Sequence, residues 1–263
     1  MNPFVFLYIW IMNFKIGIVG CGNLAFHLVK KLENSMHSVL FVFHPDKEKA
    51  RLFSKDFDRL EVVEENTFPD LDILICAVTD SSMSEVLSFY SKHYFCVSTS
   101  GTFDIADINS ENTSTLYPLQ TFNKLSSVDF ESVPLFLEVK DENKEKLIYL
   151  AELLSANIHF LNAKQRQKLH VSAVFANNFS NHFFDISEQY CKDNELDFNW
   201  LIPLIKQSVN QLGAKSPKDL QTGPARRNDN QTIDKHLELL PENLKEIYQV
   251  VTESIKNRFQ NND

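Results

Sequence analysis

The feature that most constrains the fold is a glycine-rich turn between an apolar run and an amphipathic run, at residues 15–25 (KIGIVGCGNLA). In this Gly-x-Gly-x-x-Ala pattern Gly20 permits a tight turn, Gly22 lets an anion approach the backbone, and Ala25 allows a helix to pack closely on a strand. Free N–H groups at the start of such a helix attract a diphosphate. We therefore predict a dinucleotide site at Gly20, Gly22, Asn23 and Leu24. The alternative is a glycine turn of purely structural use.

Short apolar runs alternate with amphipathic runs from residue 13 to about residue 162, which indicates a parallel sheet flanked by helices. The predicted strands are KIGIVG, SVLFVF, LEVV, DILICAV, YFCVS, STLYP, PLFLEV and NIHFL. The predicted helices between them are 23–33, 47–55, 82–91 and 142–155. The predicted fold class is α/β, a Rossmann doubly wound and mostly parallel sheet.

After residue 162 the strand pattern stops and the remainder has the spacing of helices. The predicted helices are 163–192, 200–212, 231–239 and 242–258. We therefore predict two domains, an NADP-binding Rossmann domain at 13–162 and an all-α C-terminal domain at 163–263.

The first eleven residues are apolar, but the run is too short to span a bilayer and no Lys or Arg precedes it, as a signal peptide would require. Met12 stands immediately before the first predicted strand. We expect translation to start there, which makes residues 1–12 a non-native or disordered extension.

Charge and cysteine content narrow the class of function. The formal net charge of -9 and the lack of a basic run argue against a nucleic-acid partner. The four cysteines (Cys21, Cys76, Cys96 and Cys191) lack the close spacing of metal or dithiol motifs, so we interpret them as reduced thiols. A soluble, cytoplasmic protein that binds a small molecule, with no membrane and no metal, is expected.

The end of the second predicted strand bears on the choice of nucleotide. An acidic residue there would bind the ribose hydroxyls and repel a 2′-phosphate. The strand ends at His44, and Lys47, Lys49 and Arg51 follow, which favours NADP; Asp46 leaves NAD as the less favoured alternative.

Other cofactor contacts are expected where later strands end, because ligands of open α/β sheets lie beyond the carboxyl ends of the strands. The predicted contacts are Val78, Thr79, Asp80, Ser100 and Gly101. An ordinary turn remains the alternative for the small-residue loop at 98–102.

Several longer motifs resemble one family. They are GIVGCGNLA, VTD at 78–80, STSGT at 98–102, YPLQTF at 117–122, LHVSAVFANNFSNH at 169–182 and TGPARRND at 222–229. Together they resemble Rossmann-like NADP oxidoreductases with a C-terminal helical domain of unknown function, 2520, related to pyrroline-5-carboxylate reductase and 6-phosphogluconate dehydrogenase. The resemblance implies a homodimer through the helical domain.

The resemblance also implies a proton donor and an amide on the first long helix after the boundary. That helix offers His170 as general acid and Asn178 to orient the substrate, with Asn177 and Asn181 at helical spacing. Such relatives most often use lysine, so this chain departs from them. A histidine that is hydrogen-bonded within the domain or dimer is the alternative for His170.

Two further segments supply candidate substrate contacts. One is the loop after a strand with Tyr117, Gln120 and Thr121, where a simple turn is the alternative. The other holds Arg226 and Arg227, suited to a carboxylate or phosphate; an ion pair with Asp229 is the alternative.

Two functions fit these observations. The favoured one is an NADP(H)-dependent oxidoreductase that transfers hydride between the nicotinamide and a small carbonyl or imine substrate. The other is a non-catalytic NADP-binding module that regulates a partner or senses the redox state.

Overall fold

The structure, a computed structural model, describes residues 14–35, 38–63 and 69–260. The chain forms two compact units, which divide between Asn181 and His182. The predicted extension at 1–12 and its start at Met12 lie outside the described residues.

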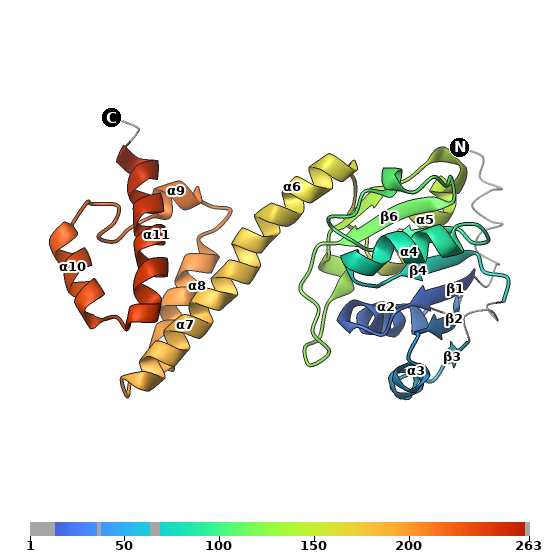
Figure 1. The fold of residues 1–263 in the computed structure, drawn as a ribbon, viewed down its shortest axis with the longest axis horizontal. Coiled ribbons are helices and arrows are strands. Elements are labelled where there is room, and N and C mark those ends of the chain that lie inside the picture. Colours follow the sequence, from blue (N-terminus) through green and yellow to red (C-terminus); the bar gives the residue numbers. More distant parts are fainter. Residues whose placement is uncertain (1–13, 36–37, 64–68, 261–263) are drawn as a thin grey trace. The chain divides into compact units, whose positions relative to one another are not determined.

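The first unit is built on one sheet with the strand order β3-β2-β1-β4-β5-β6-β7-β8 (Figure 1). The strands are β1 Phe14–Val19, β2 Ser38–Phe43, β3 Leu60–Val62, β4 Ile73–Cys76, β5 Cys96–Ser98, β6 Thr113–Pro118, β7 Leu135–Glu138 and β8 Ile158–Phe160. The first six are mutually parallel, β7 is antiparallel to β6, and β8 is parallel to β7. The order reverses between β1 and β4, the point where nucleotides bind in such sheets.

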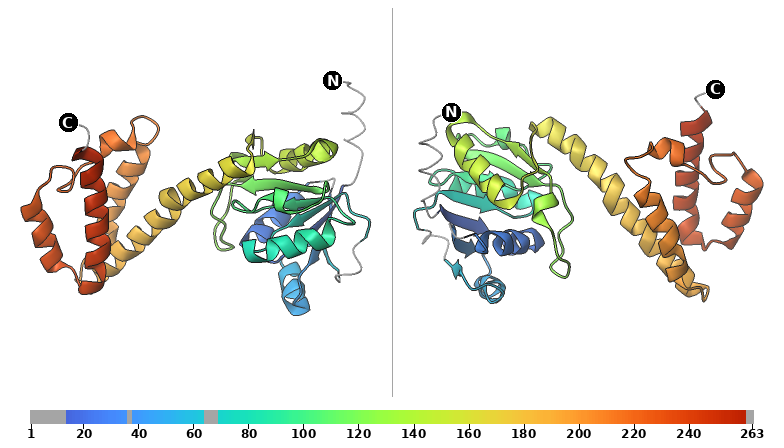
Figure 2. Two further views of the ribbon diagram at one scale, coloured as in Figure 1. Left: turned by 45° about the horizontal axis from the view of Figure 1, so that its top comes forward. Right: turned by 180° about the vertical axis from the view of Figure 1, so that it is seen from behind.

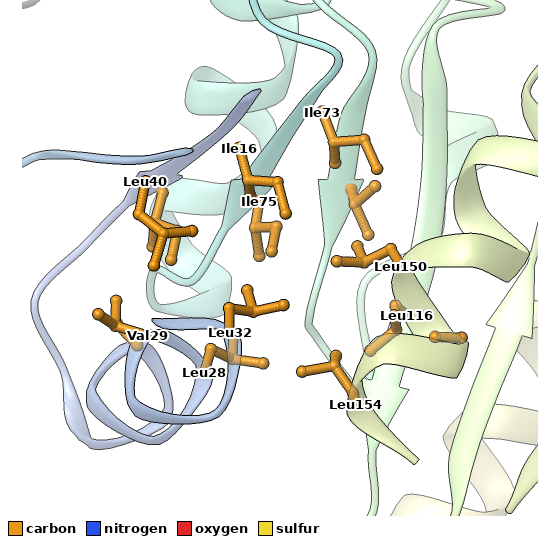
Figure 3. Close-up of a cluster of buried hydrophobic side chains, with 14 of the residues drawn as sticks. Ile16, Leu28, Val29, Leu32, Leu40, Ile73, Ile75, Leu116, Leu150 and Leu154 are labelled. Atoms are coloured by element: carbon orange, nitrogen blue, oxygen red, sulfur yellow. The ribbon is translucent and has the colours of Figure 1, made fainter. Parts of the chain in front are cut away.

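Helices cover both faces of this sheet because successive side chains of its buried strands point to opposite sides. On β4, Ile73 and Ile75 join a core cluster with residues of α2 (Asn23–Glu33), α3 (Lys47–Ser54) and α5 (Lys144–Leu154). Figure 3 shows Leu28 and Leu32 of α2 and Leu150 and Leu154 of α5 in that cluster. Leu74 and Cys76 face the other way, towards Met83 and Leu87 of α4 (Asp80–Tyr90).

The helical part of the chain begins with α6 (Ala163–Ala173), which Asn162 opens with a capping box with Gln165. A π-helical segment, η4 (Val174–Phe179), follows, and α7 (Ser180–Asp193) continues from it. The division between the compact units therefore lies inside the predicted helix 163–192, later than the predicted domain boundary.

The second unit is built from helices and loops (Figure 2). Its further helices are η5 Phe198–Leu201, α8 Ile202–Asn210, α9 Pro217–Leu220, α10 Asn230–Leu239 and α11 Glu242–Gln260. Only the single turn α9 was absent from the sequence-based expectation.

The predicted fold class is confirmed: a mostly parallel Rossmann-like sheet is followed by a helical C-terminal region. All four cysteines are buried free thiols. Within the described part of the chain, no helix is long and apolar enough to cross a membrane.

Candidate functional site

The glycine turn after β1 has one glycine that the fold itself requires. Gly20 has φ +114°, and a Cβ there would lie 2.2 Å from the carbonyl oxygen of Ala77 at the end of β4. Its N–H donates to the carbonyl of Phe43, at the end of β2, at 2.9 Å. Gly20 therefore joins the ends of three strands in a conformation that L side chains rarely adopt.

Gly22, in contrast, faces open space. A Cβ at this position would meet nothing within 4 Å. Gly22 is the N-cap of α2, and no side chain among the described residues caps the helix, which leaves the N–H groups of its first turn for a ligand. These N–H groups and the positive end of the helix dipole suit a diphosphate, as predicted for Asn23 and Leu24.

A hollow of about 430 Å³ lies against this turn. Gly20 and Gly22 line one side, and Val78 and Thr79, which follow β4, line another. Phe89 of α4 also lines the hollow and is 46% exposed. Sequence reasoning missed Phe89, because an apolar residue on an amphipathic helix is ordinarily assigned to the core.

The hollow is also lined by residues that bear on the choice between NAD and NADP. His44 and Lys49 line it, and Glu85 brings one carboxylate. Asp46 uses Oδ1 to cap α3, where this oxygen accepts from the N–H groups of Glu48 and Lys49, each at 3.0 Å. Asp46, the acidic residue that left NAD as the alternative, therefore has a structural role as the cap of α3.

Cys21, inside the glycine turn, also lines the hollow. Burial raises the pKa of its thiol to about 11, against smaller lowering effects of Lys49 and Lys124. The group therefore stays neutral near pH 7 and adds no negative charge where a diphosphate would bind.

The loops after β4 and β5 are tied to each other. The hydroxyl of Thr102 donates to the carboxylate of Asp80. Ser100 turns its own oxygen inward, where it accepts from the N–H groups of Thr102 and Phe103 at 3.1 and 2.9 Å. The predicted cofactor residues Asp80 and Ser100 thus shape the loops, and the structure places them beside the strand ends.

Tyr117 and His170 come together from distant parts of the chain. Tyr117 lies within β6, not in the loop after it, and its hydroxyl is 3.0 Å from Nδ1 of His170 on α6. Gly101 lies against both rings: a Cβ there would be 2.6 Å from Nδ1 of His170 and 2.9 Å from Cε2 and Cζ of Tyr117. The predicted cofactor, substrate and catalytic residues of this region therefore form one cluster.

The first two turns of α6 are anchored on the sheet by side chains that sequence reasoning did not single out. Arg166, whose side chain is 1% exposed, pairs with Glu138 of β7 and donates to the carbonyl of Phe103. Gln167 donates to the carbonyl of Thr102 at 2.8 Å. These bonds hold His170, one turn later, against Tyr117.

The asparagines of this helix fall in the π-helical segment η4. Asn177 donates from Nδ2 to Oγ1 of Thr121, in the loop after β6, at 2.6 Å. Gln120 accepts from the N–H of Thr121 at 2.8 Å. Asn178 is exposed. π-Helical turns are frequent at functional sites. In this one, Asn177 contacts the loop that holds the predicted substrate residues Gln120 and Thr121.

Arg226 and Arg227 belong to the second compact unit, whereas the site residues described above belong to the first. Arg226 donates to the carbonyl of Gln221 and stacks 5.1 Å from the ring centroid of Phe259. Hydrogen bonds from Thr232 lower the pKa of Asp229, and the charge of Arg227 adds to the effect. Among the described residues no ion pair joins either arginine to Asp229.

No group of three or more His, Cys, Asp or Glu side chains in the described part of the chain is arranged to hold a metal ion. The candidate site therefore has two parts. They are the titratable pair Tyr117 and His170 and the hollow at the glycine turn.

Comparison with known families agrees with this geometry. Residues 15–100 match the family model described as NADP oxidoreductase coenzyme F420-dependent, and residues 133–255 match the domain of unknown function DUF2520. The resemblance predicted from the motifs is confirmed. No curated protein sequence matches the chain at a significant level.

Solved structures share the fold along nearly the whole chain. A Bacteroides fragilis protein named as an NADP oxidoreductase is 28% identical, covering 93% of this chain and 98% of its own, with a TM-score of 0.85. Pyrroline-5-carboxylate reductase from Streptococcus pyogenes is 14% identical, covering 92% and 98%, with a TM-score of 0.61. An imine reductase from Myxococcus stipitatus in complex with NADP⁺ is 13% identical, covering 94% and 93%, with a TM-score of 0.63, and a variant of it holds NAD⁺. The family matches and the Bacteroides fragilis relative support an NAD(P)-dependent oxidoreductase, and the other structures show the shared fold.

Proposed function

We propose that this chain, with its NADP oxidoreductase region and its DUF2520 region, is an NADP(H)-dependent oxidoreductase that transfers hydride between the nicotinamide and a small carbonyl or imine substrate. The observation that carries the proposal is a titratable pair, Tyr117 and His170, at the same sheet edge as an unobstructed glycine turn. Because β1, β4, β5 and β6 are parallel, the residues at their carboxyl ends share one edge of the sheet.

The residues present fit a nicotinamide dinucleotide. Gly20, Gly22 and the start of α2 would hold the diphosphate, and Phe89 offers an exposed ring for the adenine. The bound cofactor would supply the hydride. The chain itself would orient the substrate with uncharged groups at Thr121 and Asn177, and His170 would be the source of the proton.

We propose NADP rather than NAD because the hollow has a cationic and an imidazole side chain where a 2′-phosphate would lie. Lys49 and His44 line it, while Asp46 is engaged at the start of α3. For Lys49→Gln we expect roughly tenfold weaker binding of NADPH and unchanged binding of NADH, since a charged hydrogen bond contributes about 1.5 kcal/mol. Calorimetric titration of both nucleotides measures this. The control is Lys55→Gln, an exposed change at the C-terminal end of the same helix, and equal losses for NADPH and NADH would contradict the assignment.

The second candidate function is the non-catalytic NADP-binding module, and one experiment separates the two. Protein mixed with NADPH in a stopped-flow instrument is challenged with a panel of small aldehydes, ketones and cyclic imines such as 1-pyrroline. An oxidoreductase oxidises NADPH in the presence of at least one of them. Tight binding of NADPH with no oxidation above the protein-free rate would favour the binding module.

We also propose a homodimer, which the family resemblance implies. Val171, Phe175 and Phe179 are 56%, 65% and 46% exposed, and they recur at intervals of four residues on α6 and η4. Exposed apolar stripes of this kind commonly mark an interface, and the occupant proposed here is a second copy of the chain. Light scattering on the purified protein tests it: a monomer at micromolar concentration would contradict the proposal.

A further inference from the structure

The hydrogen bond between Tyr117 and His170 joins a buried group to one that reaches water. Tyr117 is 9% exposed, because Gly101 and Phe136 pack against its ring. His170 is half-buried on α6. A proton lost from the phenol is therefore replaced most directly through the imidazole, whose Nδ1 lies 3.0 Å from the hydroxyl.

The pair is held in place by neighbours that leave little freedom. Gly101 admits both rings only because it lacks a Cβ. Arg166 and Gln167 fix the helix turn before His170 on the loop that follows β5. A hydrogen bond between side chains from two elements, fixed on both sides, is a feature of groups that act together.

The charges around the pair favour the neutral phenol. Burial raises the pKa of Tyr117, and so does the charge of Asp80 on α4; the charge of Arg166 on α6 acts in the opposite direction. Arg166 is itself paired with Glu138 on β7. The phenol therefore stays protonated near neutral pH, and a tyrosinate formed there is driven to regain a proton.

We propose that Tyr117 is the catalytic residue that gives the proton to the substrate atom that hydride attack leaves basic, and that His170 restores the phenol's proton from water. The proposal rests on the proposed function and refines the role of His170 within it. In the reductive direction hydride adds to the carbon of C=O or C=N, and the double-bond electron pair moves to the oxygen or nitrogen. That atom takes the hydroxyl proton of Tyr117 as the O–H bond of the phenol breaks.

The remaining steps return the pair to its starting state. The tyrosinate takes the proton from Nδ1 of the His170 imidazolium, which leaves a neutral imidazole that accepts a hydrogen bond from the phenol. The imidazole then regains its proton on Nδ1 from a hydronium ion of the solvent, which leaves water and restores the imidazolium. The cycle thus starts and ends with a protonated phenol and an imidazolium.

The first test removes only the hydroxyl of Tyr117. Tyr117→Phe keeps the ring against Gly101 and Phe136, so we expect at least a hundredfold lower kcat for NADPH oxidation with 1-pyrroline or the best carbonyl of the panel, with KM changed less than threefold. The control is Tyr149→Phe, the same change on α5, where the ring packs on Phe14 at 4.6 Å between centroids.

Two outcomes are distinguishable here. Wild-type protein that oxidises NADPH with none of the substrates overturns the proposed function and this inference with it. Wild-type protein that turns over, with Tyr117→Phe at more than half its rate, overturns the inference alone.

The second test asks whether His170 acts through Tyr117. For His170→Ala we expect a lower kcat and partial recovery in added imidazole, while the double variant with Tyr117→Phe recovers nothing. Equal recovery of both variants would make His170 the direct donor and overturn the relay. His93→Ala, an exposed histidine after α4, serves as control.

A third readout needs no turnover. Nitrogen-15 NMR of the full-length, nucleotide-free protein reports which ring nitrogen of neutral His170 carries the proton. We expect it on Nε2 in the wild type, because Nδ1 accepts from the phenol, and a mixture of both tautomers in Tyr117→Phe. A wild-type ring protonated on Nδ1, or no change in the variant, would contradict the relay.

Discussion

The glycine turn and the cluster around Tyr117 are two halves of one candidate site, and they are built in opposite ways. The turn uses residues that follow each other along the chain, and its conformation is a property of the backbone. The cluster brings together β6, the loop after β5 and α6; its hydrogen bond from Gln167 to Thr102 spans 65 residues. We infer that substitutions in the turn act locally, through backbone strain or nucleotide approach, whereas substitutions in the cluster act by moving their neighbours.

The largest expected effect is that of Gly20→Ala, which breaks the turn itself. The new Cβ meets the Ala77 carbonyl at 2.2 Å on a backbone with φ +114°, so strain and steric overlap combine. We expect a loss of about 3 to 5 kcal/mol in the free energy of unfolding, measured by urea denaturation. A loss below 1 kcal/mol would show that the strand ends shift freely.

The counterpart in the cluster is Arg166→Met, which keeps the aliphatic stem and removes the charge. It leaves Glu138, whose side chain is 24% exposed, without its partner, and it frees the start of α6 from the carbonyl of Phe103. We expect a loss of about 2 to 4 kcal/mol, somewhat less than for a fully buried pair. Arg51→Met, an exposed change on α3, is expected to stay within about 0.5 kcal/mol, and equal effects of the two variants would contradict the anchoring role.

Gly101→Ala sharpens the comparison, because the backbone there needs no positive φ and the glycine serves only to admit two rings. We expect about 1 to 3 kcal/mol of destabilisation. Turnover should fall by more than tenfold, since the hydroxyl of Tyr117 and Nδ1 of His170 are pushed apart. Denaturation and kinetics on one preparation measure both, and a stable, fully active variant would refute the steric role of Gly101.

Gly22→Ala is expected to have the smallest effect on the fold and a clear effect on binding. With nothing within 4 Å of the new Cβ, the free energy of unfolding should change by less than about 1 kcal/mol. NADPH should bind at least tenfold more weakly, because the methyl group stands where the diphosphate approaches. Calorimetry decides the matter: unchanged affinity would mean that the nucleotide does not lie over Gly22.

The sequence was sufficient to predict the architecture because the signals are local. Every predicted strand is present, and the predicted helix at 23–33 has the bounds of α2. Apolar runs of four to seven residues bounded by turn residues, and a glycine turn between strand and helix, depend on neighbours in the chain alone.

The cluster was only partly predictable, because its contacts join segments that no local pattern connects. His170, Tyr117 and Gly101 were each singled out, but for three different roles and without their mutual contact. Arg166 on a mostly polar helix has the same sequence signature as a solvated charge, and its burial follows from Glu138 on a distant strand. The π-helical turn at Val174–Phe179 was missed, since helical spacing is nearly the same in the flanking turns.

The anchoring of α6 decides where this chain can be cut. A fragment that ends at residue 162, where the strand pattern stops, would carry Glu138 without its guanidinium and would lose His170 altogether. A fragment that extends to Asn181 keeps every hydrogen bond that the first two turns of α6 make to the sheet and its loops. Excision for crystallography, or grafting of this nucleotide-binding half onto another protein, should therefore include the helix as part of the graft.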